Sequence, residues 1–159
     1  RHRRTRVRGR DLMAGRTFVD ASVLVRLFDD DEPARQAAAR ALVGDVDGPA
    51  LVVSGPVLAE FAEAVTTHMA RPLSVVVARR ALAELAELTV VPADASLVLA
   101  ATDTAAEAGL AVRDALSVEA AVVGGCDRLA TEALAHGGLI RGVWIEDPAW
   151  ETVEEGESP

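Results

Sequence analysis

The sequence contains no lysine and no tyrosine, and it has a single cysteine, Cys126. Without lysine there is no G-x-x-x-x-G-K-[ST] loop, so a nucleotide-binding protein of the P-loop class is excluded. A phospho-receiver site is excluded for the same reason, because it also uses a lysine late in its sheet. One cysteine cannot form an intramolecular disulfide and is consistent with a reducing compartment. We therefore expect a cytoplasmic protein.

Several other patterns are also missing. No apolar run is long enough to cross a bilayer, and no charged-then-apolar segment suggests a signal peptide, so we expect no membrane association. No G-x-G-x-x-G or G-x-S-x-G motif is present, and the first predicted strand is not followed by Asp-x-Asp. The histidines His2, His68 and His136 lack metal-ligand spacing, and we interpret the last two as surface or packing residues. Cys126 lies among glycines and is interpreted as a small buried residue rather than a nucleophile.

Charge is distributed unevenly along the chain. Residues 1–12 contain six of the sixteen arginines and one acidic residue, which leaves ten basic and 24 acidic residues in the remainder. We predict a basic, disordered arm at 1–15, a folded domain at 16–148 and an acidic tail at 149–159. A disordered tail or a start-site artefact is preferred over a nucleic-acid-binding arm. The acidic body would repel RNA or DNA at long range, so a polyanionic substrate requires cations at the site.

Short apolar segments alternate with segments of helical composition. Strands are predicted at 16–20, 51–53, 89–91, 128–131 and 143–146. Helices are predicted at 21–28, 34–43, 54–65, 72–88, 94–107 and 113–123. This alternation predicts an α/β domain with a parallel sheet covered on both faces. Ligands of such sheets bind beyond the C-terminal ends of the strands, where Asp20 and Thr131 are placed.

Three acidic residues, Asp20, Glu60 and Asp114, are the remaining candidates for chemistry. Taken singly, Asp20 and Asp114 are ordinary helix caps and Glu60 is an exposed helix acid. However, Glu60 shares a helical stripe with Val57 and Ala64, and Asp114 begins an almost wholly apolar helix that must be buried. Three acids in one pocket repel one another unless a cation lies between them. Mg²⁺ prefers such oxygen ligands and supports phosphodiester hydrolysis by activating water.

Three segments, "VDASVL", "VLAEF" and "RDALSVEAAVVGGCDRLATEALAHGG", resemble the PIN domain family, specifically the VapC-type ribonuclease toxins. The resemblance extends over residues 17–148. It implies a three-layer α/β/α sandwich with a central parallel sheet. It also implies endoribonuclease activity that depends on Mg²⁺ or Mn²⁺, a cognate antitoxin as partner, and usually a homodimer.

The resemblance also implies roles for individual residues. Asp20, Glu60 and Asp114 match acidic residues that hold the metal and carry catalysis. Ser22 matches a small polar residue that supports the first acid, and Thr131 matches the threonine at the end of the fourth strand.

One position departs from the family pattern, which has Thr-x-Asp where this chain has Thr131-Glu132-Ala133. Glu132 is predicted to face away, because neighbouring side chains on an extended backbone point to opposite sides. Asp127 lies too far back along the strand, and Glu119 lies off the helical face of the third acid. The sequence thus leaves two interpretations open: a ribonuclease, weakened or inactivated by loss of the fourth acid, and a binder of RNA or antitoxin that does not cut. A third interpretation, less favoured, is an α/β domain without a functional site in which the three acids are placed by coincidence.

Overall fold

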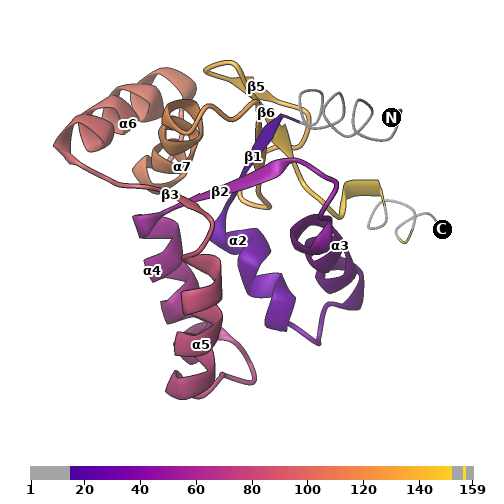
Figure 1. The fold of residues 1–159 in the computed structure, drawn as a ribbon. Coiled ribbons are helices and arrows are strands. Elements are labelled where there is room, and N and C mark those ends of the chain that lie inside the picture. Colours follow the sequence, from indigo (N-terminus) through magenta and orange to yellow (C-terminus); the bar gives the residue numbers. More distant parts are fainter. Residues whose placement is uncertain (1–14, 152–155, 157–159) are drawn as a thin grey trace, which may run out of the picture.

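Six strands form one sheet in the order β3-β2-β1-β4-β6-β5 (Figure 1). The structure, a computed structural model, describes residues 15–151 and residue 156. The strands are β1 (Arg16–Val19), β2 (Ala50–Ser54), β3 (Thr89–Val91), β4 (Arg128–Ala130), β5 (Leu139–Ile140) and β6 (Val143–Glu146). All neighbouring pairs are parallel except β5 and β6. The C-terminal ends of β1, β2 and β4 therefore meet at one edge of the sheet.

Helices cover both faces of this sheet, as expected for an α/β/α sandwich. They are α2 (Ala21–Leu24), the 3₁₀ helix η1 (Val25–Phe28), α3 (Pro33–Gly44), α4 (Gly55–Glu63), the π-helix η2 (Ala64–His68), α5 (Val75–Leu85), α6 (Ala95–Ala108) and α7 (Val112–Val123). Helix α7 packs on β1, β2, β4 and β6, and α6 packs on α7. Helices α2 to α5 lie on the opposite side (Figure 1).

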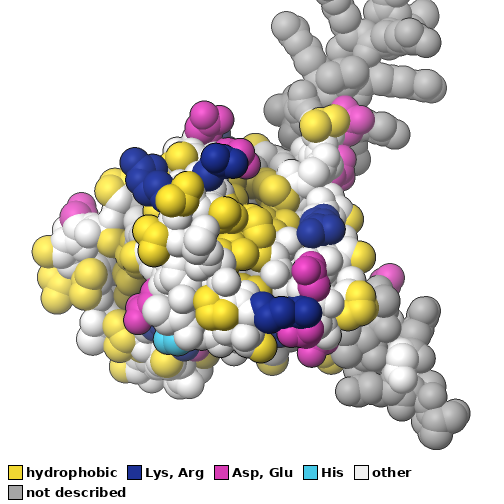
Figure 2. All heavy atoms as spheres, turned by 90° about the horizontal axis from the view of Figure 1, so that it is seen from below, with side chains coloured by type: hydrophobic (Ala, Val, Ile, Leu, Met, Phe, Trp, Pro, Cys, Tyr) yellow, Lys and Arg dark blue, Asp and Glu magenta, His cyan; other side chains and the backbone are white. Residues whose placement is uncertain are grey.

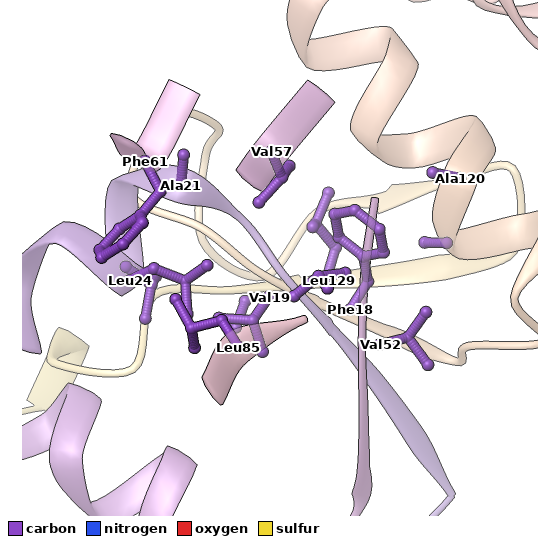
Figure 3. Packing of buried hydrophobic residues seen from close by; sticks show 14 of the residues in the cluster. Phe18, Val19, Ala21, Leu24, Val52, Val57, Phe61, Leu85, Ala120 and Leu129 are labelled. Carbon is purple, nitrogen blue, oxygen red and sulfur yellow. The ribbon is translucent and has the colours of Figure 1, made fainter. Parts of the chain in front are cut away.

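Strand β1 is buried on both faces after the exposed Arg16, which agrees with the apolar pair Phe18 and Val19 at its end. Phe18 and Val19 are both fully buried, and Phe18 is paired in register with Val52 of β2. In Figure 3, Phe18 lies on the side of the sheet that carries Ala120, whereas Val19 lies with Leu24. The core on both sides of the sheet thus fixes where β1 ends and where the next residue is placed.

Two predicted helix starts are confirmed. Ser54 Oγ accepts a hydrogen bond of 3.3 Å from Val57 N at the start of α4, and Asp94 Oδ1 accepts one of 2.9 Å from Leu97 N at the start of α6. Such side-chain caps satisfy backbone N–H groups that have no partner within the helix. Helix α4, which carries Glu60, is therefore anchored directly at the end of β2.

The prediction was wrong in two places. Helix α5 is shorter than the predicted 72–88, because Ser74 caps it by accepting a bond from Val77 N. The sheet is not entirely parallel, because the short strand β5 pairs antiparallel with β6. Arg141 and Gly142 link these strands with positive φ angles of 53° and 76°, as tight hairpin turns require. A strand of two residues is too short to give a periodic signal.

The predicted arm at 1–15, apart from Gly15, and most of the tail at 149–159 lie outside the described residues. Within the described part of the chain, no single helix is long and apolar enough to cross a membrane. The consecutive helices α6 and α7 reach that length and composition only when taken together, across a bend of 115°. Figure 2 shows hydrophobic side chains gathered in a hollow on one face, with separate basic and acidic side chains around it.

Candidate active site

Asp20 directly follows β1 and is still held in the sheet. Its backbone N–H donates a hydrogen bond of 3.0 Å to Ala130 O of the neighbouring strand β4. Its carboxylate makes no side-chain cap hydrogen bond with α2, although Asp20 occupies the N-cap position. The interpretation of Asp20 as a simple helix cap is therefore wrong, and its side chain serves something else.

Three hydroxyl groups hold the Asp20 carboxylate. Ser22 Oγ and Thr131 Oγ1 donate to Oδ2 at 2.9 and 2.8 Å, and Ser117 Oγ donates to Oδ1 at 3.3 Å. The residue is only 7% exposed. A carboxylate offers about four lone-pair positions, so these donors leave roughly one for a further ligand. Asp20 is thus rigidly placed and incompletely satisfied.

The same hydroxyls fix the backbone that follows β4. Ser22 Oγ accepts a hydrogen bond from Glu132 N, and Thr131 Oγ1 accepts one from Ala133 N, both at 3.0 Å. Hydroxyls can donate and accept together, so each one connects the Asp20 carboxylate to the segment after β4. Ser22 and Thr131 are placed where a supporting role was predicted.

Glu60 and Asp114 lie across a pocket from Asp20. All three acids line a pocket of about 250 Å³, together with a fourth acid, the exposed Glu63, and with Ala133 and His68. Burial raises the pKa of Glu60 above its ordinary value, and the charges of Asp20 and Asp114 raise it further. Burial also raises the pKa of Asp114, with a second contribution from Asp20. The negative charges of the pocket thus oppose one another.

One cation partly offsets this repulsion. Arg113 Nε lies 3.8 Å from Glu60 Oε1, and its charge lowers the pKa of both Glu60 and Asp114. Across residues 15–151 and 156, no group of three or more Asp, Glu, His or Cys side chains is already arranged so that it could hold a metal ion. The acids thus line one pocket without converging on a single point in this structure.

In the segment after β4, the neighbouring residues Glu132 and Ala133 face in different directions. Glu132 turns away from the pocket, and its carboxylate binds Arg26 Nη2 at 3.0 Å and Arg35 Nη1 at 2.9 Å. Ala133 lines the pocket instead. This agrees with the facing argument from the sequence and places a methyl group where the family pattern has an acid.

The other two acids considered as substitutes lie elsewhere. Asp127 Oδ1 accepts a hydrogen bond from Arg16 N, at the N-terminal end of the sheet. Glu119 is buried and accepts hydrogen bonds from Thr104 Oγ1 and Arg141 Nε. Neither contributes to the pocket.

Two residues of this region were not predicted to belong to the site. Ser117 lies three positions after Asp114, so both fall on one face of α7, and this spacing could have revealed its role. His68, interpreted as a surface or packing residue, is exposed as expected, and it also lines the pocket. His68 is the last residue of the π-helix η2, in which Met69 N donates to Ala64 O. No local sequence signal announces such a turn.

The remaining chemically capable side chains have structural roles. The ring of His136 stacks on Trp150 with centroids 4.6 Å apart, and its Nδ1 accepts a hydrogen bond from Asp147 N. Cys126 is buried, and burial raises the pKa of its thiol to about 11. A thiol that stays protonated is a poor nucleophile, which agrees with its interpretation as a packing residue.

Comparison with known families identifies the domain. A sequence model of the PIN domain family matches residues 17–132. The chain belongs to the PIN domain family. Proteins of the PIN family are typically nucleases, and PIN nucleases generally use a divalent metal ion. No curated protein gives a significant match to this chain.

Solved structures confirm the PIN fold. VapC20 from Mycobacterium tuberculosis, a sarcin-ricin loop cleaving toxin, is 21% identical with a TM-score of 0.55, over 72% of this chain and 88% of that chain. VapBC2 from Rickettsia felis, bound to a promoter DNA fragment, is 15% identical with a TM-score of 0.53, over 82% and 97%. VapBC-1 from nontypeable Haemophilus influenzae is 14% identical with a TM-score of 0.55, over 84% and 98%. At these identities the likeness concerns the fold.

Proposed function

We propose that this PIN domain protein is a VapC-type toxin, a metal-dependent endoribonuclease that hydrolyses RNA phosphodiester bonds. The observation that carries the proposal is the group of three carboxylates, Asp20, Glu60 and Asp114, in one pocket at the strand ends. Among the described residues, Arg113 is the one arginine that lines this pocket, and its contact with Glu60 is loose, at 3.8 Å. The similarity in fold to VapC20, a toxin that cleaves the sarcin-ricin loop, supports RNA as the substrate.

The donor set fits a hard divalent cation such as Mg²⁺ or Mn²⁺. The three acids supply only oxygen ligands, and Mg²⁺ is usually held by one or two carboxylates together with water and phosphate oxygens. Burial raises the pKa of Glu60 and of Asp114, and the negative charge of Asp20 adds to both shifts, so a bound cation would relieve part of the cost of keeping these acids ionised. A bound cation of this kind supplies activated water and stabilises charge on phosphate oxygens.

We assign a different role to each group of residues in the pocket. Asp20, fixed by three hydroxyls, would hold the cation in a constant place. Glu60 and Asp114 are half-buried and line the same pocket, so they would complete the oxygen ligands of the cation and hold the attacking water molecule. Ser22, Ser117 and Thr131 act through Asp20 by restricting its orientation.

A cognate antitoxin is the proposed partner, and two of the similar structures are VapBC assemblies. We propose that an antitoxin segment covers the pocket and places an arginine against Asp20 and Asp114, because a guanidinium pairs well with carboxylates. A structure of the complex that leaves the pocket open to solvent would contradict this. We also propose that the protein forms a homodimer, which light scattering of the purified protein tests. We propose the cytoplasm as its location.

The second candidate function is a PIN-like protein that binds RNA or antitoxin without cutting. Ala133 favours it, because the pocket lacks a carboxylate at the position where the family pattern has one. The first candidate is favoured by the retention of Asp20 together with the three hydroxyls that orient it.

Cleavage of RNA separates the two candidates. Parent protein, Asp114→Asn and Asp94→Asn are incubated with ribosomal and messenger RNA in Mg²⁺ or Mn²⁺, and in EDTA. Asp94 caps α6 away from the pocket, so its variant controls for removal of one charge. If the protein is a ribonuclease, the parent and Asp94→Asn should cleave RNA. Cleavage should be lost in EDTA and in the Asp114→Asn variant. Metal binding and RNA binding without any cleavage would favour the binder.

A further inference from the structure

Arg113 is the one arginine among the described residues that line the acidic pocket. It lies in the first turn of α7, adjacent to Asp114 in sequence, and its Nε is 3.8 Å from Glu60 Oε1. Its side chain is 72% exposed. The guanidinium therefore stands at the mouth of the pocket, between the carboxylates and the solvent.

The contact between Arg113 and Glu60 is loose compared with other ion pairs of this protein. Arg26 and Arg35 each bind two carboxylates at 3.2 Å or less, and their side chains are only 27% and 21% exposed. An exposed pair at 3.8 Å contributes little to stability, because water screens the charges and two long side chains must be ordered. Arg113 can therefore leave Glu60 at little cost.

We propose that Arg113 is an exchangeable counter-ion of the pocket: it offsets Glu60 in the metal-free protein, and binds an RNA phosphate once a divalent cation takes its place. This inference rests on the proposed function and assigns a substrate contact within it. Arg113 is thereby a substrate-binding residue whose position depends on whether the metal is present.

Two physical requirements lead to this assignment. First, an arginine and a divalent cation that share Glu60 compete, so each weakens the binding of the other. Second, RNA must approach a chain that carries a net charge of −9, and an approaching phosphate is repelled unless cations line its path. A guanidinium at the pocket mouth supplies two parallel N–H donors for a phosphate.

Metal binding without RNA tests the first part of the proposal, that Arg113 and the divalent cation compete for Glu60. Mn²⁺ is titrated calorimetrically into metal-free parent, Arg113→Ala, Arg113→Lys and Arg80→Ala. Arg80 is an exposed arginine of α5 outside the pocket, so Arg80→Ala matches the change in net charge. Arg113→Ala should bind Mn²⁺ about two- to fivefold more tightly than the parent, as expected for loss of one exposed ion pair. Arg113→Lys and Arg80→Ala should stay close to the parent.

RNA binding tests the second part of the proposal, that Arg113 contacts an RNA phosphate when the cation is bound. The initial fluorescence anisotropy of a labelled single-stranded RNA of mixed sequence is read on rapid mixing with each protein in saturating Mn²⁺. Arg113→Ala should bind more weakly, and the slope of log K against log salt should fall by about 0.7 for one lost phosphate contact on a single strand. Arg80→Ala should keep the parental affinity and slope.

The outcomes separate this inference from the proposed function. Unchanged or weaker Mn²⁺ binding by Arg113→Ala, or equal tightening by Arg80→Ala, overturns the inference and leaves the metal site standing. Unchanged RNA binding by Arg113→Ala overturns the substrate contact. A parent that binds no Mn²⁺ contradicts the proposed metal site and the inference together. Both expected results without cleavage would support the inference and favour the binder.

Discussion

Two acidic clusters flank the segment Thr131–Ala133, and they differ in how their charge is balanced. The compensated cluster consists of the acids Asp29, Glu132 and Asp147 with the bases Arg26 and Arg35. The site cluster consists of the acids Asp20, Glu60 and Asp114 with the base Arg113. In the compensated cluster the ion pairs span 2.6 to 3.2 Å. In the site cluster the one ion pair spans 3.8 Å.

The difference shows that unbalanced charge, not the number of acids, marks the site. Glu132 belongs to this segment and Asp20 contacts it through Thr131, and both acids are largely buried. Glu132 receives two guanidinium groups, which ties η1, α3 and the end of β4 together. Asp20 receives only neutral hydroxyls, which orient its charge and leave it available. The first arrangement suits stability, and the second suits binding of a cation.

Glu132→Gln should have the largest effect on folding. It keeps the shape of the side chain but removes the charge that faces Arg26 and Arg35, and these would be left partly buried with one acid each. Loss of one partner from a buried pair is strongly destabilising. At 13% exposure of the Glu132 side chain, we expect the free energy of unfolding to fall by about 2 kcal/mol. Urea denaturation measures this, with the exposed acid of Glu84→Gln as control. A loss no larger than that of the control would mean that the cluster does not stabilise the fold.

Ala133→Asp should increase the catalytic activity of the site cluster. The side chain of Ala133 faces the pocket, so an acid there adds a ligand or ligand-positioning group beside Asp20. RNA cleavage should increase by one or more decades, each being about 1.4 kcal/mol of activation free energy. The gain should vanish in EDTA and in an Asp114→Asn background, since all of these groups act on the same cation. A parent that is already fully active and is abolished by Glu132→Ala would show that Glu132 is the fourth acid.

Thr131→Val should loosen Asp20 without changing any charge. Valine has the shape of threonine but lacks the hydroxyl that donates to Asp20 and accepts from Ala133 N. We expect a loss of about 1 kcal/mol in stability and a tenfold or larger loss in Mn²⁺ affinity, the usual effect of removing a residue that orients a ligand. Thr102→Val on α6 is the control, because its hydroxyl bonds only to Val98 O. Unaltered Mn²⁺ binding would show that this hydroxyl does not position the carboxylate.

The pH dependence of stability should show the smallest effect. The pKa values of Glu60 and Asp114 are raised above ordinary values of 4.5 and 3.8. The native state therefore binds more protons than the unfolded state between the ordinary and raised values, and metal-free stability should fall as pH rises through that window. Because both side chains are half exposed, we expect only a few tenths of a kcal/mol. Glu60→Gln should flatten this part of the curve of unfolding free energy against pH. A curve that is the same in parent and variant would contradict the charge repulsion.

Sequence patterns were sufficient for the frame of this fold and for the acids at its edge. Strand β1 is apolar because it is buried on both faces, so its end at Asp20 could be located. Parallel strands bring their C-terminal ends together, which predicted that Asp20 and Thr131 would be neighbours. The conclusion that Ala133 replaces an acid came from the family pattern alone.

Other features depend on contacts that no local pattern encodes. Arg26 and Glu132 are separated by 106 positions, and nothing in either segment announces the other. The hydroxyl of Ser117 reaches Asp20 only because α7 lies across the end of β1. The π-helix η2, which ends at His68, also has no sequence signature. Long-range pairing, rather than local propensity, thus separates the compensated cluster from the site cluster.

The central claim is that the site cluster is unbalanced and the compensated cluster is not. The melting temperature of the parent, Asp114→Asn and Glu132→Gln, each with and without Mn²⁺, tests it most directly. Without metal, Asp114→Asn should melt slightly above the parent, because one repelling charge is gone, and Glu132→Gln should melt well below it. Mn²⁺ should raise the melting temperature of the parent and of Glu132→Gln by linkage, and that of Asp114→Asn much less. A parent that does not respond to Mn²⁺, or an Asp114→Asn variant that responds as strongly as the parent, would contradict the account.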